Sequence, residues 1–389
     1  MSNSDKPKIL VRPLQYRDLE GLELFEDESG DEHPQLKQTL HQIDRWYGTI
    51  ELVRSIPNPY QYRHGLLVAE VDRQIQGIMQ VAPFNCTRST WQVKHVWVNR
   101  RIKVEENSED TTVLTAMDCG SQLLRYCFEK IVEASNWLLE VDVNDKAALA
   151  LYRHNGFQPL AQLTYWDVAP EILQELSVNV PDLPNLLPVR NNDAQLLYQL
   201  DTVAMPPLLR QVFDRQIHDF KVDVVQKAAR GVRTYFNHYR EARQYVFESQ
   251  RKAAIGYYHL NLSLEAEVHT AELTVHPAYT WLYPELMAQM AQVCQASSPE
   301  RSLQLVSADY QPEREEYLQR IGAQRTKHSL LMSRSVWHKV REAKHISLEG
   351  LQLSDVLSGL QPVRNPIPSR WESAINQDKL NLPREGAED

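Results

Sequence analysis

Apolar and polar residues follow two different periods along this chain, and together they predict a mixed α/β protein. Residues 65–83, GLLVAEVDRQIQGIMQVAP, contain two apolar runs around a polar turn, a pattern typical of a β-hairpin. Residues 120–134, GSQLLRYCFEKIVEA, repeat apolar residues at helical spacing along one stripe. The apolar run 136–143 predicts a strand, 144–156 a short helix, and 160–168 a closing strand. We therefore expect a sheet with flanking helices.

The same order of patterns occurs twice. Four landmarks recur: an arginine before an acidic helix start, a glycine in the second hairpin strand, a valine ending a long strand, and a glycine after the last helix. The pairs are Arg12 and Arg190, Gly77 and Gly256, Val98 and Val275, and Gly156 and Gly322, at offsets of 178, 179, 177 and 166 residues. Landmarks in one order at a nearly constant offset predict two copies of one fold.

The repeat sets the predicted domain organisation. We predict a first domain at 1–176, a second at 177–340 and a tail at 341–389. A stretch rich in proline and polar residues, 177–190, links the copies. The tail opens with a candidate amphipathic helix, 346–360, and its remaining proline-containing chain is predicted to be extended or disordered.

Composition and charge narrow the function classes. The chain has 389 residues, of which 42% are hydrophobic, and a formal net charge of -9. This charge argues against general binding of nucleic acid or anionic membranes. The four cysteines form no CxxC pair and no Cys/His ligand spacing, so we expect neither a disulfide framework nor a metal site. Because no apolar leader or membrane-length apolar run occurs, we predict a cytoplasmic protein.

One short segment carries candidate chemistry, the stretch NDKAALALYRHNGF at 144–157. Asn144 can cap the start of a helix, and Gly156 suits the left-handed position after its end. Three alanines leave little side-chain bulk, so another group can approach this helix closely. Tyr152 lies four residues after Ala148, on the same face. From the residues alone, Tyr152 is either a core residue or a catalytic proton donor.

This segment resembles the motif Asn-x-x-Ala-x-x-Leu-Tyr-x-x-x-Gly-Phe of the GNAT superfamily of N-acetyltransferases, and we take Asn144 as its first position. Two further stretches carry the resemblance. VKHVWV at 93–98 is similar to the family's fourth strand, and CGSQLLRYCFE at 119–129 to the end of its pyrophosphate loop and the following helix. The resemblance covers about residues 8–168, and in the second half it rests on the internal repeat.

The resemblance implies a fold and an activity. The fold is α/β (mixed α+β), with two tandem GNAT-like acyl-CoA N-acyltransferase domains, each a mixed sheet splayed between its fourth and fifth strands. Acetyl-CoA, the co-substrate, lies in the splay and donates its acetyl group to a primary amine of a small molecule or a protein. Tyr152 acts as the general acid that protonates the leaving thiolate, a contribution of roughly 10²–10⁴-fold in rate. The residues expected to bind the donor are Val96, Val98, Gly120, Ser121 and Asn144.

The stretch before the second helix departs from the family's pattern Arg/Gln-x-x-Gly-x-Gly/Ala. Thr115 stands at the arginine and Asp118 at the first glycine, and only Gly120 remains. Four carboxylates at 105–110 lie just upstream and would repel a diphosphate unless they face solvent. Either they do so, and the N–H groups of Gly120 and Ser121 are free to bind phosphate with help from cations at 100–103, or the pocket no longer binds CoA and the chain is catalytically inactive. An inactive chain would be an acyl-CoA sensor or a protein-interaction module.

A general base is also needed to take a proton from the amine. The family's strand-four glutamate position is Gln92, which cannot serve. Strict alternation places Lys94 on the face of Gln92 and His95 on the other face. His95 has a suitable intrinsic pKa and is the candidate base, with a structural role as its alternative.

The second copy lacks both the asparagine–tyrosine motif and the glycine loop. Leu318 aligns with Tyr152, Tyr310 aligns with Asn144, and no glycine loop precedes its long helix. Residues 313–320, EREEYLQR, have the pattern of a charge-rich helix face. We interpret this half as a degenerate copy that shapes the substrate cleft or completes a pseudo-dimer, in a monomer or a homodimer.

Overall fold

A computed structural model gives the fold of the chain. It describes residues 9–18, 65–99, 114–221, 239–263 and 268–336. The acidic segment, the cations at 100–103 and the predicted tail helix lie outside the described residues. The described chain forms two compact units. No helix in the described ranges is long and apolar enough to cross a membrane.

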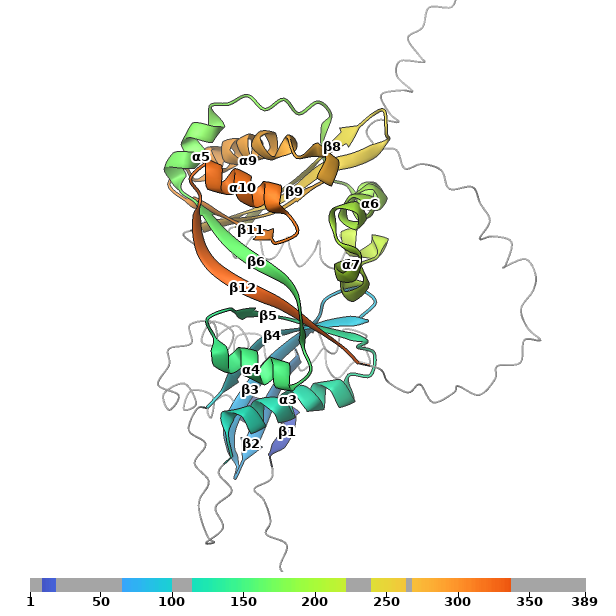
Figure 1. The fold of residues 1–389 in the computed structure, drawn as a ribbon, viewed down its shortest axis with the longest axis vertical. Coiled ribbons are helices and arrows are strands. Elements are labelled where there is room, and N and C mark those ends of the chain that lie inside the picture. Colours follow the sequence, from blue (N-terminus) through green and yellow to red (C-terminus); the bar gives the residue numbers. More distant parts are fainter. Residues whose placement is uncertain (1–8, 19–64, 100–113, 222–238, 264–267, 337–389) are drawn as a thin grey trace, which may run out of the picture. The chain divides into compact units, whose positions relative to one another are not determined.

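The first unit is a mixed sheet with two helices on one face (Figure 1). Strands β4 and β5 pair in parallel, and the other neighbouring strands pair antiparallel. In sheet order, its strands are β1 (Leu10–Pro13), β2 (Gly65–Val71), β3 (Gln74–Pro83), β4 (Thr90–Val98), β5 (Asn136–Asp142) and the end of β12 (Gln324–Ser335). The helices are α3 (Ala116–Lys130) and α4 (Lys146–His154).

The second unit repeats this plan. Its long helix α9 (Leu282–Ser297) packs on one sheet face, and α6 (Ala194–Ala204) packs on a separate apolar cluster with residues of β8 and β9. In sheet order, its strands are the second half of β6 (Gln158–Val168), β11 (Ser302–Ala308), β10 (Val268–Val275), β9 (Ala253–Ser263), β8 (Tyr239–Glu248) and β7 (Leu186–Pro188). The remaining helices are α5 (Pro170–Ser177), α7 (Pro207–Phe213) and α10 (Pro312–Arg320).

The closing strand of each copy completes the sheet of the other unit. The end of β12, Ser329–Ser335, pairs antiparallel with β5 in the first unit. The second half of β6, Leu163–Val168, pairs antiparallel with β11 in the second unit. Each unit is therefore built from both sequence copies. The boundaries after residues 176 and 340 remain predictions about the copies along the sequence.

Strand pairing reproduces the repeat landmarks. Gly77 of β3 lies opposite Val98 of β4, and Gly256 of β9 lies opposite Val275 of β10. Each glycine also lies under the long helix of its unit: a Cβ at Gly77 would lie 2.8 Å from the Sγ of Cys119. The same structural requirement therefore explains both glycines: a helix approaches the sheet too closely for a side chain at either position.

A short segment near the end of α7 belongs to the first unit. The hydroxyl of Thr90 donates to the carbonyl of Val212 at 2.6 Å, and Asn85 Nδ2 donates to that of Phe213 at 3.1 Å. These bonds fix residues 212–214 beside the start of β4.

Candidate functional site

Strands β4 and β5 pair along only part of their length. Their parallel register runs from Thr90 opposite Asn136 to Val93 opposite Leu139. Beyond this point β4 continues to Val98 and β5 to Asp142 without pairing to each other. We call these separated segments, 94–98 and 140–142, the first splay. Because the two strands no longer pair with each other here, backbone groups on their facing edges can bind a ligand.

A β-bulge lies where the first splay begins. Gln80 of β3 lies opposite His95, but Val81 lies opposite Val93, so Lys94 is an extra residue in β4. The corresponding strand β10 pairs with β9 without such a shift. The bulge thus explains why the offset between the copies falls by one residue along this strand. It is a feature of the first unit alone.

The bulge corrects the predicted face of His95. Because an extra residue reverses the alternation, Val96 and Val98 pack on the core beneath α3, and His95 and Trp97 lie on the opposite face. The rings of His95 and Trp97 stack with their centroids 4.8 Å apart. Gln92 precedes the bulge and also faces away from this core. His95 and Gln92 therefore share a face, contrary to the expectation from strict alternation.

Charged groups mark the rim of the first splay. Desolvation lowers the pKa of the Lys94 ammonium, and the nearby carboxylate of Glu140 opposes that shift. The two residues come from the two strands that separate here. Sequence analysis did not assign either residue to the site.

Helix α4 begins one residue later than predicted. Its N-cap is Asp145, whose carboxylate accepts the N–H of Ala148 at 2.9 Å, whereas the N–H of Asn144 donates to the carboxylate of Asp142 at 2.8 Å. Counted back from Tyr152, the family motif also starts at Asp145, so the assignment of its first position to Asn144 was wrong. The predicted left-handed glycine is confirmed, because Gly156 has φ of 82° directly after the C-cap.

Tyr152 is almost fully buried at the side of α4. Its side chain is 7% exposed and its ring lies edge-on to Phe157, with centroids 5.9 Å apart. Burial raises the pKa of its phenol far above the usual value, and the carboxylate of Asp145 adds to the shift. The phenol is therefore protonated at neutral pH. Such a group can donate a proton but cannot act as a base.

The residues that depart from the family's loop pattern form the cap of α3. The hydroxyl of Thr115 accepts the N–H of Asp118 at 3.2 Å, and the Asp118 carboxylate accepts the N–H of Thr115 at 3.0 Å. The Thr115 hydroxyl also donates to this carboxylate at 2.7 Å, and this bond, together with the N–H of Thr115, holds the pKa of Asp118 below its usual value. An ionised carboxylate thus occupies the helix end that attracts anions. The capping box thus satisfies the N–H groups of Thr115 and Asp118 within the chain itself.

Gly120 and Ser121 lie inside α3, in its second turn. The expectation that their N–H groups are free is wrong, because both are used in the helix. A Cβ at Gly120 would lie 2.7 Å from a methyl carbon of Leu151, and the hydroxyl of Ser121 accepts the amide of Asn155 at 2.9 Å. Both residues hold α4 against α3.

The second unit contains a matching splay. Its strands β10 and β11 pair from Val268 opposite Ser302 to Ala271 opposite Leu305. The segments beyond, 272–275 on β10 and 306–308 on β11, do not pair with each other; we call them the second splay.

Arg314 of α10 bridges the second splay. Its guanidinium donates to the carbonyl of Leu273 on β10 and, at 2.9 Å, to that of Val306 on β11. The side chain is only 5% exposed, whereas the charge-rich pattern of residues 313–320 predicts that it faces solvent. The repeat offset aligns Arg314 with Ala148, whose methyl group cannot span a splay. One unit thus has a bridged splay, and α4 places no such bridge in the other.

The described residues contain no group of three or more His, Cys, Asp or Glu side chains arranged to hold a metal ion. The residues predicted to act together fall into three places. Val96 and Val98 lie on the first splay, His95 lies beside them on the opposite face, and Tyr152 lies on α4.

Solved structures show that the chain has a tandem GNAT fold. A GCN5-related N-acetyltransferase from Sphaerobacter thermophilus is similar with a TM-score of 0.51 and 12% identity, over 85% of this chain and 97% of that one. A tandem GNAT protein from the clavulanic acid biosynthesis pathway, without AcCoA, is similar with a TM-score of 0.50 and 12% identity, over 86% and 100%. No protein-family model and no curated protein matches the sequence.

Proposed function

We propose that the chain is an N-acetyltransferase that moves an acetyl group from acetyl-CoA to a primary amine in the first unit. The observation that carries this proposal is the contrast between the two splays. Arg314 bridges the second splay, whereas the aligned residue beside the first splay is Ala148. A chain with no use for the first splay would gain by bridging both, because unpaired strand edges leave polar groups unsatisfied.

The second splay also indicates which backbone groups the donor would meet. The carbonyl of Leu273 points into the second splay, since Arg314 binds it there. Leu273 lies opposite Tyr258, and its counterpart Val96 lies opposite Met79 in the same register. The backbone of Val96 therefore faces the first splay, and Val98 follows on the same edge. These groups suit the amide-containing pantetheine arm and the acetyl carbonyl.

The proposed chemistry is a direct transfer. The amine nitrogen attacks the thioester carbonyl, the C–S bond breaks, and the phenol of Tyr152 gives its proton to the departing thiolate. The phenol of Tyr152 carries its proton at neutral pH, so the proton is available when the thiolate forms. The attacking amine must lose a proton, and His95 is the proposed base, on the strand beside the splay.

The cap of α3 favours a second candidate, a GNAT-fold protein that senses acyl-CoA or binds partners without catalysis. The carboxylate of Asp118 repels a diphosphate at the start of the helix. The N–H groups of Ala116 and Met117 are the first-turn groups left for it. Gly120 and Ser121 would contribute to donor binding only indirectly, because they hold α4 against α3.

Calorimetric titration of the full chain with acetyl-CoA separates the candidates. The transferase proposal expects saturable binding of one donor per chain, because the second splay is bridged, and acetylation of a primary-amine acceptor when a panel of amines is added. Binding with no transfer to any amine would favour the sensor. Two donors per chain would contradict the assignment of function to the first unit alone.

A further inference from the structure

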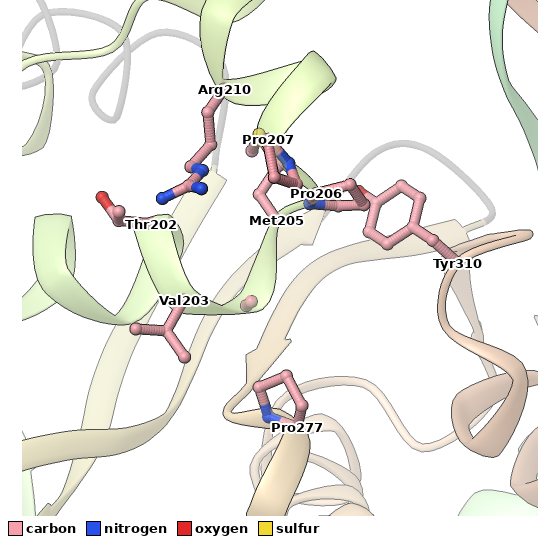
Figure 2. Close-up of a pocket in the computed structure, with 9 residues that line it drawn as sticks. Thr202, Val203, Met205, Pro206, Pro207, Arg210, Pro277 and Tyr310 are labelled. Atoms are coloured by element: carbon pink, nitrogen blue, oxygen red, sulfur yellow. The ribbon is translucent and has the colours of Figure 1, made fainter.

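The second unit contains a cavity of about 390 Å³ at the turn between α6 and α7 (Figure 2). The α6–α7 turn supplies most of the wall, and the segments that follow β10 and β11 supply the rest. The lining residues are Thr202, Val203, Ala204, Met205, Pro206, Pro207, Arg210, Pro277 and Tyr310.

The position of this cavity relates it to the second splay. Pro277 comes two residues after the end of β10, and Tyr310 two residues after the end of β11. The cavity is therefore at the carboxyl ends of the two strands that separate, a common place for ligands in α/β folds. Since Arg314 bridges these strands, a molecule in the cavity would not meet a thioester held between them.

The lining has one charge on a wall to which polar and apolar atoms contribute about equally. Val203, Met205 and three prolines present carbon atoms, and Thr202 and Tyr310 add hydroxyl groups. Figure 2 shows the guanidinium of Arg210 pointing back towards the α6 side of the cavity. Within the described part of the chain, Arg210 forms no ion pair, whereas nearby Arg215 pairs with Asp201 at 3.0 Å. No acidic residue lines the cavity.

We propose that this cavity binds a small monocarboxylate with an apolar body, and that the second unit is a ligand-binding module, not a second transferase. A guanidinium recognises a carboxylate through paired N–H donors. The single positive charge of the lining matches one negative charge better than the two of a phosphate. The prolines and Met205 contact the apolar body at the open face of the hollow, and the hydroxyl groups of Thr202 and Tyr310 accept or donate hydrogen bonds at its edges.

Titration of the full chain with 3-phenylpropionate, followed by calorimetry, tests this inference. The neutral amide 3-phenylpropionamide is the matched ligand control. We expect saturation below about 10 mM, and about tenfold weaker binding of the amide. Arg210→Gln should weaken binding of the carboxylate about tenfold and leave the amide unaffected, and Tyr310→Phe should weaken both slightly.

Two controls separate this site from the proposed active site. Arg320→Gln removes an exposed guanidinium elsewhere in the second unit and should not change binding. Tyr152→Phe should also leave binding unchanged, so the cavity can be established even if the transferase proposal fails. Equal affinity for acid and amide, an unaltered affinity in Arg210→Gln, or no saturation up to about 10 mM would overturn the inference.

Discussion

The first and second splays share strand register and helix position, but they differ in what crosses them. In the second splay, Arg314 satisfies carbonyls on both separating strands. In the first splay, the methyl group of the aligned Ala148 cannot bind the backbone carbonyls of the separating strands. A bulge at Lys94 also changes the course of β4 there. The difference shows how one fold can be stable both with and without a ligand-ready opening. A long polar side chain supplies the hydrogen bonds that a bound donor would otherwise make.

The two units also differ one helical turn after Arg314 and Ala148. Leu318 is buried in the core of the second unit, and Tyr152 occupies its place in the first. The fold therefore needs an apolar side chain here, but it does not need a hydroxyl group. A phenol that the fold does not require is a candidate for chemistry.

Ala148→Arg should have the largest effect, because it copies the bridge of the second splay into the first. We expect acetyl-CoA affinity to fall by about a thousandfold, as the guanidinium would occupy the donor's hydrogen-bonding groups. Calorimetry measures the affinity, and circular dichroism checks that the fold is retained. Ala150→Arg, at an exposed position of the same helix, is the matched control and should bind the donor normally. Equal loss in both variants would show that any arginine on α4 is harmful, which would contradict the proposed equivalence of Ala148 and Arg314.

Tyr152→Phe should have the next largest effect. We expect kcat to be about a hundredfold lower and the donor affinity to change little. The hydroxyl group is lost, but the ring and its packing on Phe157 remain. Steady-state kinetics with an amine acceptor measures the effect. Because burial raises the pKa of Tyr152 above its ordinary value of about 10, its loss of a proton should not reduce kcat below that pH. An unchanged kcat in the variant would assign Tyr152 to the core alone.

The repeat, the mixed sheet and the helix that bears Tyr152 can be predicted from the sequence, because they depend on apolar periodicity within short segments. The sequence does not predict that β6 and β12 complete opposite units, since an apolar closing strand fits either sheet equally well. The buried role of Arg314 is not predictable either, because arginine in a charged helix usually faces solvent. The bulge at Lys94 was detectable in principle, as the offset of the repeat changes by one residue along β4. The capping box of Thr115 and Asp118 was present as residue types but was interpreted only as a departure from a phosphate loop.

Arg314→Met tests the other side of the comparison. Met fills much of the same volume without donors, so the carbonyls of Leu273 and Val306 lose their partners in a buried place. We expect the free energy of unfolding to fall by about 2–3 kcal/mol. Urea unfolding measures this change. Donor binding should remain at one molecule per chain, because the first unit is unchanged, and binding of a second donor would contradict this expectation.

Asp118→Asn should produce the smallest change, and it tests whether the cap of α3 competes with the donor. Asparagine keeps an oxygen that can accept the N–H of Thr115, but it removes the ionised carboxylate from the helix start. We expect acetyl-CoA to bind about three- to tenfold more tightly, because one repulsive charge near the diphosphate is lost. Pantetheine is the matched ligand control. Because it lacks the diphosphate, its affinity should not respond to the substitution. If acetyl-CoA binds no more tightly to Asp118→Asn, its phosphates lie away from α3, and the donor is held mainly by the strand edge at Val96 and Val98.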